Sequence, residues 1–167
     1  MEKKEFTILI KDWLESFLKK RYSNTHDILR VIIPNTRLSK LSDSDIKKCK
    51  NYSAWDFKPD ILGILKNKKN AQIELVFLNR SISALSLKEI GEIYCYSKLA
   101  GSRISFLTSL RGVSNEVNIL LVNDSMRDRL LKYTVNGQIV IFSWNEEEKK
   151  INKNSIIPTD KREFLLQ

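Results

Sequence analysis

The sequence predicts an α/β protein in which helices flank a mixed central sheet. Three features of the chain lead to this prediction: an amphipathic helix ahead of the first strand, a pair of apolar runs that form a hairpin, and a helix between that hairpin and a later strand. A hairpin gives antiparallel neighbours and a helical crossover gives a parallel pair, so the sheet should contain both. The 167 residues show no repeat or linker, and we expect one domain over 1–167.

The first expected element is a helix over 7–22. Apolar residues such as Ile8, Trp13 and Phe17 recur there at helical spacing, and the last turn is basic, which suits the helix dipole. A β-branched run over 28–34 then predicts a strand. The polar stretch that follows holds one short possible helix at 42–50.

The apolar runs at 61–65 and 73–78 flank the polar connection 66–70 and predict the hairpin. A helix is expected next, over 87–100. Ser86 and Glu89 have the spacing of a capping box at its start, and Gly101 falls at its end.

The remaining chain predicts three strands and one short helix. The strands are expected at 103–109, 116–123 and 138–144, and the helix at 124–133. The charged segment from about residue 146 onward is expected to pack loosely.

Composition narrows the function classes. The net charge of +9 and the pI near 9.5 make a phosphate backbone such as DNA a plausible partner, although a lysine-rich chain also follows from an AT-rich genome. No run of 18 apolar residues and no signal peptide is visible, so no membrane span is expected and the expected compartment is the cytoplasm. Cys49, Cys95 and the single histidine, His26, exclude zinc ribbons and histidine-rich metal sites, and His26 is interpreted as a turn residue.

Two carboxylates on the predicted hairpin suggest a metal site. Asp60 opens the first apolar run, and Glu74 lies inside the second. Glu74, Val76, Leu78 and Arg80 share one face of their strand by parity, and a bulge or bend would let Asp60 converge on Glu74. Carboxylate oxygens with a backbone carbonyl and waters suit Mg²⁺ or Mn²⁺, which can activate water for phosphodiester hydrolysis. Exposure or a salt bridge is the alternative explanation for Glu74.

The stretch resembles the PD-(D/E)xK nuclease superfamily, which includes many restriction endonucleases. The resemblance rests on Pro59-Asp60, on Glu74-Leu75-Val76, and on an element order like the restriction endonuclease-like αβββαβ core. GEIYCY, residues 91–96, is similar to the GQxxxY pattern of that superfamily, with Glu92 where glutamine is frequent. The resemblance implies that Asp60 and Glu74 ligate the cation and that Leu75 offers its carbonyl.

The superfamily's lysine is expected two residues after Glu74, where Val76 stands. Three interpretations compete. The lysine could come from elsewhere, and the candidates are Lys58, Lys88 and Lys98. Another group could substitute, although Arg80 is too far along the strand to do so and could only grip a flanking phosphate. In the third interpretation the site is inactive.

The resulting hypothesis is a metal-dependent DNA endonuclease of a restriction, defence or repair system. Its expected catalytic residues are Asp60, Glu74, Lys88 and Glu92, its metal ligands are Asp60, Glu74 and Leu75, and its cofactor is Mg²⁺ or Mn²⁺. A symmetric homodimer would suit a palindromic target. The alternative is a catalytically inactive module of the nuclease fold that binds nucleic acid or a protein partner.

Overall fold

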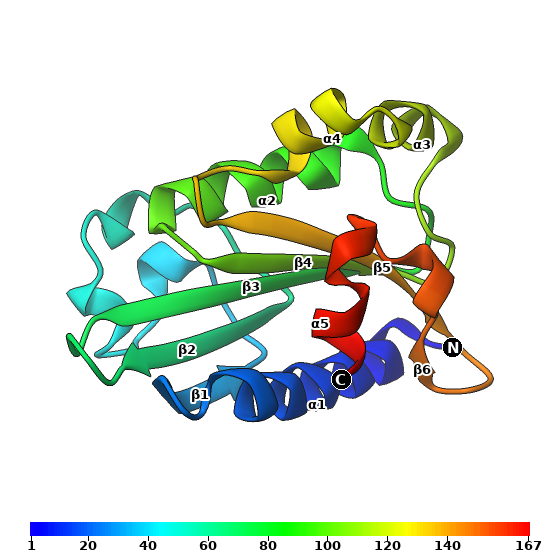
Figure 1. Cartoon of the computed structure of the whole chain (residues 1–167). Coiled ribbons are helices and arrows are strands. Elements are labelled where there is room, and N and C mark those ends of the chain that lie inside the picture. Colours follow the sequence, from blue (N-terminus) through cyan, green and yellow to red (C-terminus); the bar gives the residue numbers. More distant parts are fainter.

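Six strands form one sheet in which every strand lies beside its neighbours in chain order (Figure 1). This computed structural model describes residues 1–167. Pairing is antiparallel from β1 to β3, parallel from β3 to β5, and antiparallel again between β5 and β6. The predicted mixed sheet is therefore confirmed. The strands are β1 (His26–Ile32), β2 (Ile61–Asn67), β3 (Ile73–Ser81), β4 (Ile104–Ser109), β5 (Gln138–Asn145) and β6 (Lys150–Ile151).

Helices cover both faces of the sheet, as Figure 1 shows. α1 (Lys3–Tyr22) and the short α5 (Arg162–Leu166) pack on one face, and α2 (Leu87–Ala100) packs on the other with α4 (Asp124–Leu131) beside it. Each strand divides its side chains between two cores. On β3, for example, Val76 faces the α1 core while Leu75 and Phe77 face the α2 core. The predicted alternation of β3 side chains between the two faces of the sheet is therefore confirmed.

The two long helices follow the expected pattern. α1 begins at Lys3, one turn earlier than predicted, and ends at Tyr22 as expected. α2 has the predicted bounds. Ser86 and Glu89 form the capping box at its start, and Gly101 ends it with a φ of 64°, a left-handed conformation that glycine adopts without strain.

Between β1 and β2 the chain makes three 3₁₀ helices, at Leu38–Lys40, Ile46–Lys48 and Tyr52–Ala54. Only the middle one falls in the stretch where a short helix was expected. Trp55 and Phe57 of this segment are buried in the α2 core. The segment therefore covers the part of that face that α2 leaves open.

The strand predicted at 116–123 is wrong: these residues form α3 (Asn115–Val122). Ser114 caps the helix by accepting a hydrogen bond from the Val117 amide. Val117 and Leu121 are buried, whereas Ile119 is 73% exposed. Burial thus repeats every four residues, although the apolar run alone could not distinguish a helix from a strand.

The chain after β5 is structured around the α1 face. β6 is followed by two 3₁₀ helices, at Lys153–Ser155 and Thr159–Lys161, and then by α5. Ile156 and Leu165 are buried in the α1 core. No helix of the structure is both long enough and apolar enough to cross a membrane.

Candidate functional site

The register of the β2–β3 hairpin decides where the two predicted acids lie. Ile61 pairs with Leu78 and Leu65 pairs with Glu74, without a bulge between them. Asp60 therefore lies beside the end of β3 and Glu74 beside the end of β2. Five residues of strand separate the two positions, on the order of 16 Å at the rise of an extended chain. The expected convergence does not occur, because the sheet's bulge lies between β1 and β2 instead.

Asp60 is held by the end of β3. Its backbone N–H donates to Asn79 Oδ1 at 3.0 Å, and its Oδ2 accepts from the Arg80 N–H at 2.8 Å. The Arg80 guanidinium lies 3.7 Å from Asp60 Oδ1 and donates through Nε to Thr7 Oγ1 of α1 at 2.8 Å. Only 8% of the Arg80 side chain is exposed. The charge of Asp60 is thus balanced by a nearly buried arginine.

A hollow of about 570 Å³ opens beside this ion pair, where α1 begins, β1 has ended and β2 is about to start. Lys3, Lys4 and Lys58 are exposed on its rim, and Arg80 and Asp60 lie on its wall. Four positive side chains thus face a single carboxylate, and the amino-terminal end of α1 adds positive potential. We call this region the Asp60–Arg80 pocket.

Glu74 lies at the other end of the hairpin, in a different environment. One carboxylate oxygen is 3.2 Å from His26 Nε2, and the other accepts from Asn67 Nδ2 at 3.2 Å and from the Arg103 guanidinium at 3.3 Å. His26 is 1% exposed and is the first residue of β1, so its interpretation as a turn residue is wrong. These polar and charged partners explain how the Glu74 carboxylate is accommodated in an otherwise apolar strand.

The residues after Glu74 are parts of the core. The Leu75 carbonyl accepts a hydrogen bond from Ser102 Oγ at 2.5 Å. Val76 is 3% exposed and pairs with Gly63 beneath α1. A Cβ on Gly63 would lie 2.9 Å from Leu18 Cδ1, so α1 approaches the sheet closely at this point. A lysine at 76 would have to place its ammonium in that apolar layer.

The two α2 residues predicted to be catalytic do not join either acid. Lys88 and Glu92 are exposed on α2, on the face of the sheet opposite α1. Of the three lysines considered as replacements, Lys58 alone lines the Asp60–Arg80 pocket. Lys98 lines another hollow, near Gln72.

Two further acids on the helices, Glu89 and Glu15, have local partners. Glu89 accepts from the Ser86 N–H in the capping box, and its pKa lies below the usual range because those hydrogen bonds outweigh the opposing effect of burial. Glu15 bridges Lys11 and Lys19 along α1, which lowers its pKa. Both acids are thus structural residues of helices.

The implied cation can be tested against these positions. Asp60, Glu74 and the Leu75 carbonyl do not form one set of oxygen ligands, because the first is at the far end of the hairpin and the last accepts from Ser102. No group of three or more histidine, cysteine, aspartate or glutamate side chains is placed to hold a metal ion. The three ligands that the resemblance implies therefore do not fit one shared Mg²⁺ or Mn²⁺ ion.

No protein-family model matches the chain, and a search of curated proteins also finds no match.

Proposed function

We propose that this chain is a DNA-binding module with a restriction endonuclease-like core, and that it contacts the phosphate backbone at the Asp60–Arg80 pocket without cleaving it. Its order of elements from α1 to β4 supports the nuclease-like part of the proposal, since it is the αβββαβ order of that core. The net charge of +9 favours a polyanionic partner.

One observation carries the proposal: the pocket gathers Lys3, Lys4 and Lys58 around an acid that is already paired with Arg80. Flexible exposed lysines bind phosphate oxygens as point charges and release counterions from the nucleic acid. The buried guanidinium adds positive charge to the pocket wall and keeps the Asp60 carboxylate from repelling a phosphate.

A metal-dependent endonuclease is the second candidate, and Pro59-Asp60 at the start of β2 is the feature in its favour. It would need a second carboxylate next to Asp60. The neighbouring part of β3 offers Leu78, Asn79 and Arg80 and no acid. Binding without hydrolysis is therefore the function that the geometry supports best.

Binding of a labelled duplex at two salt concentrations tests the proposal. A variant in which Lys3, Lys4 and Lys58 are alanine should bind more weakly, and the slope of log K against log salt should become shallower by roughly 3 if each lysine contacts one phosphate. The matched control replaces three other exposed lysines by alanine and should change binding less. These control residues, at the opposite end of the sheet, are Lys66, Lys68 and Lys69.

A cleavage assay separates the two candidates. Plasmid incubated with wild-type protein and Mg²⁺ or Mn²⁺ should remain intact. Cleavage that disappears in both Asp60→Ala and Glu74→Ala would establish the endonuclease and refute binding without hydrolysis. Equal duplex affinity of the wild type and the triple pocket variant would refute the binding surface.

A further inference from the structure

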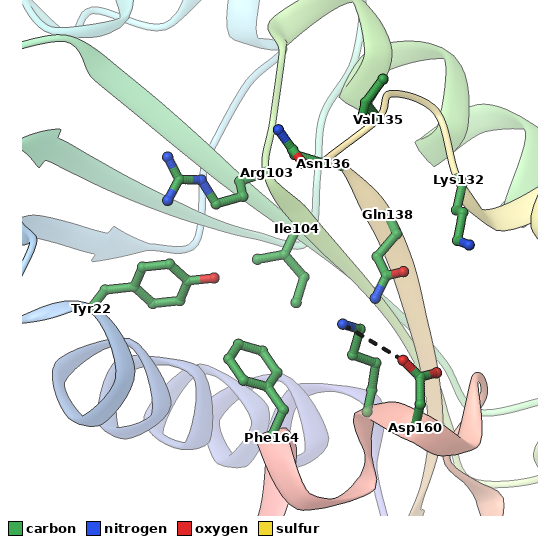
Figure 2. Close-up of a pocket in the computed structure, with 11 residues that line it drawn as sticks. Tyr22, Arg103, Ile104, Lys132, Val135, Asn136, Gln138, Asp160 and Phe164 are labelled. Atoms are coloured by element: carbon green, nitrogen blue, oxygen red, sulfur yellow. Dashed lines mark ion pairs between the residues drawn. The ribbon is translucent and has the colours of Figure 1, made fainter.

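A second hollow, of about 390 Å³, lies at the opposite end of the sheet from the Asp60–Arg80 pocket (Figure 2). It is bordered by the last residue of α1, the first residues of β4 and β5, and the segment that leads into α5. Its size falls in the range of roughly 300–1,000 Å³ that small-molecule sites occupy. The residues that matter for its chemistry are Tyr22, Arg103, Ile104, Gln138, Lys161 and Phe164.

Two aromatic rings in the wall are held in place by a third. Tyr22 and Phe164 both meet Phe17 of α1 edge to face, with ring centroids 6.4 and 5.3 Å away. Ile104, which is 4% exposed, and the exposed Val135 add to the apolar part of the lining. Because packing already fixes the two rings, a flat apolar ligand would lose little affinity to ordering them.

Polar groups converge on the same space. Figure 2 shows the Tyr22 hydroxyl and the Gln138 amide directed toward the hollow. The amide can donate and accept side by side, as the edge of a nucleobase requires. Burial raises the pKa of Tyr22, and nearby Glu74 adds to the rise against the opposing effect of Arg103, so the phenol stays a neutral donor.

Three cations surround this polar edge. Lys161 lines the hollow and is only loosely paired with Asp160, at 3.8 Å. Arg103 is paired with Glu74 at 3.3 Å and Lys132 with Asp128 at 2.9 Å, and their side chains are 49% and 51% exposed. An anionic group at the mouth of the hollow would thus meet positive charge that is partly open to solvent while a ring occupies the interior.

We propose that this hollow is a binding site for one nucleotide unit. The base lies against Phe164 and Ile104 with its polar edge at Gln138 and Tyr22, and the phosphate contacts Lys161 and Arg103. A free mononucleotide and the terminal nucleotide of a strand share this chemistry. The site is independent of the proposed Asp60–Arg80 function, because no residue is common to the two pockets.

Titration of the ¹⁵N-labelled full chain with adenosine 5′-monophosphate tests the site. Saturable shifts are expected at the amides of residues 22, 103, 138 and 161, and adenosine or inorganic phosphate alone should bind more weakly. Gln138→Ala, Lys161→Ala and the conservative Tyr22→Phe should each weaken binding roughly three- to tenfold, the effect of one hydrogen bond or charge contact. Lys88→Ala, at an exposed position of α2 that lines neither pocket, should leave it unchanged.

Two further arms identify the source of the nucleotide. A 5′-phosphorylated tetranucleotide that binds more tightly than the monophosphate, and than its unphosphorylated counterpart, indicates a strand end. Equal or weaker binding of the tetranucleotide indicates a free nucleotide. Absence of saturable shifts up to about 10 mM monophosphate, or unchanged affinity in all three pocket variants, overturns the proposal whatever the outcome at the Asp60–Arg80 pocket.

Discussion

The two ends of the β2–β3 hairpin each carry one acid of the nuclease-like motif, yet the two acids have different partners and surroundings. At one end Asp60 is paired with Arg80 beside an open pocket that is rimmed by lysines. At the other end Glu74 contacts the buried His26 and the half-exposed Arg103. The sequence spacing of the acids resembles a nuclease, but an antiparallel register places them apart.

This difference shows why spacing along a hairpin is a poor guide to a shared site. In an antiparallel pair, a residue at the start of the first strand meets the end of the second. The partner positions of Asp60 are therefore near Asn79, and those of Glu74 are near Leu65. Each acid instead acquires partners from other elements: Thr7 of α1 anchors Arg80, and β1 supplies His26.

The largest loss of stability is expected from a substitution at Val76, which lies between the two ends of the hairpin. Val76→Lys, which restores the superfamily's lysine, should lower the free energy of unfolding by about 3–5 kcal/mol, because an unpaired ammonium would be buried beneath α1. Urea unfolding measures the loss. Val76→Ala is the control for lost packing alone and should cost roughly 1–3 kcal/mol. A Val76→Lys protein that is as stable as wild type and cleaves DNA would contradict the account.

Replacing the arginine at each end compares the two environments directly. Arg80→Ala should reduce the free energy of unfolding by about 2–4 kcal/mol, since it removes the link to Thr7 and leaves Asp60 without its charge partner. Arg103→Ala should cost at most about 1 kcal/mol because its own side chain is 49% exposed and can be replaced by water. Equal losses in chemical denaturation would mean that the two ends do not differ in this way.

A smaller effect is expected when the acid of the His26 end is removed. Glu74→Ala should destabilise the fold by about 1–3 kcal/mol, because Asn67 and Arg103 lose their hydrogen-bond acceptor and the buried His26 loses its neighbouring carboxylate. Glu92→Ala, which removes an exposed acid of α2, should stay within about 0.5 kcal/mol of wild type. Thermal unfolding of both variants under one buffer condition gives the comparison. A neutral Glu74→Ala would show that these contacts add no stability.

The smallest expected effect is on the ionisation of Tyr22. Burial raises its pKa, Arg103 opposes the rise and Glu74 adds to it. Glu74→Gln should therefore lower the Tyr22 pKa, and Arg103→Gln should raise it, in an alkaline titration followed by ¹³C NMR of labelled tyrosine. The raised pKa contributes stability that is complete below the ordinary tyrosine value of about 10 and is lost as pH rises through the folded value. Identical titrations in both variants would place Tyr22 beyond the influence of these charges.

Much of the fold was predictable because it is encoded in local periodicity. The apolar spacing of α1, the capping box of α2 at Ser86 and the parity of β3 all depend on residues close in sequence. α3 was mistaken for a strand because a short segment with apolar residues at 117 and 119–122 fits both periods, and only its burial pattern distinguishes them.

The candidate site was less predictable, because it depends on contacts between distant segments. Nothing near His26 in the chain indicates that it will be buried against Glu74. Thr7 and Arg80 are 73 residues apart, and only the packing of α1 on the sheet brings them together. The alternation of side chains along β3 did predict that Arg80 lies on the same face as Glu74 and Val76. Because Val76 packs against α1, this alternation was the one sequence signal for the direction of the arginine.

A Mg²⁺ titration followed at the side-chain carboxyl carbons tests the separation of the two acids most directly. Mg²⁺ is added to the ¹³C-labelled protein, free and bound to a short duplex, while the carboxyl ¹³C signals of Asp60 and Glu74 are followed. Because the acids lie at opposite ends of the hairpin, we predict that the two carboxyl signals do not shift together with one dissociation constant. Saturable shifts of both signals with the same dissociation constant, and loss of the Glu74 shift in Asp60→Ala, would contradict the separation.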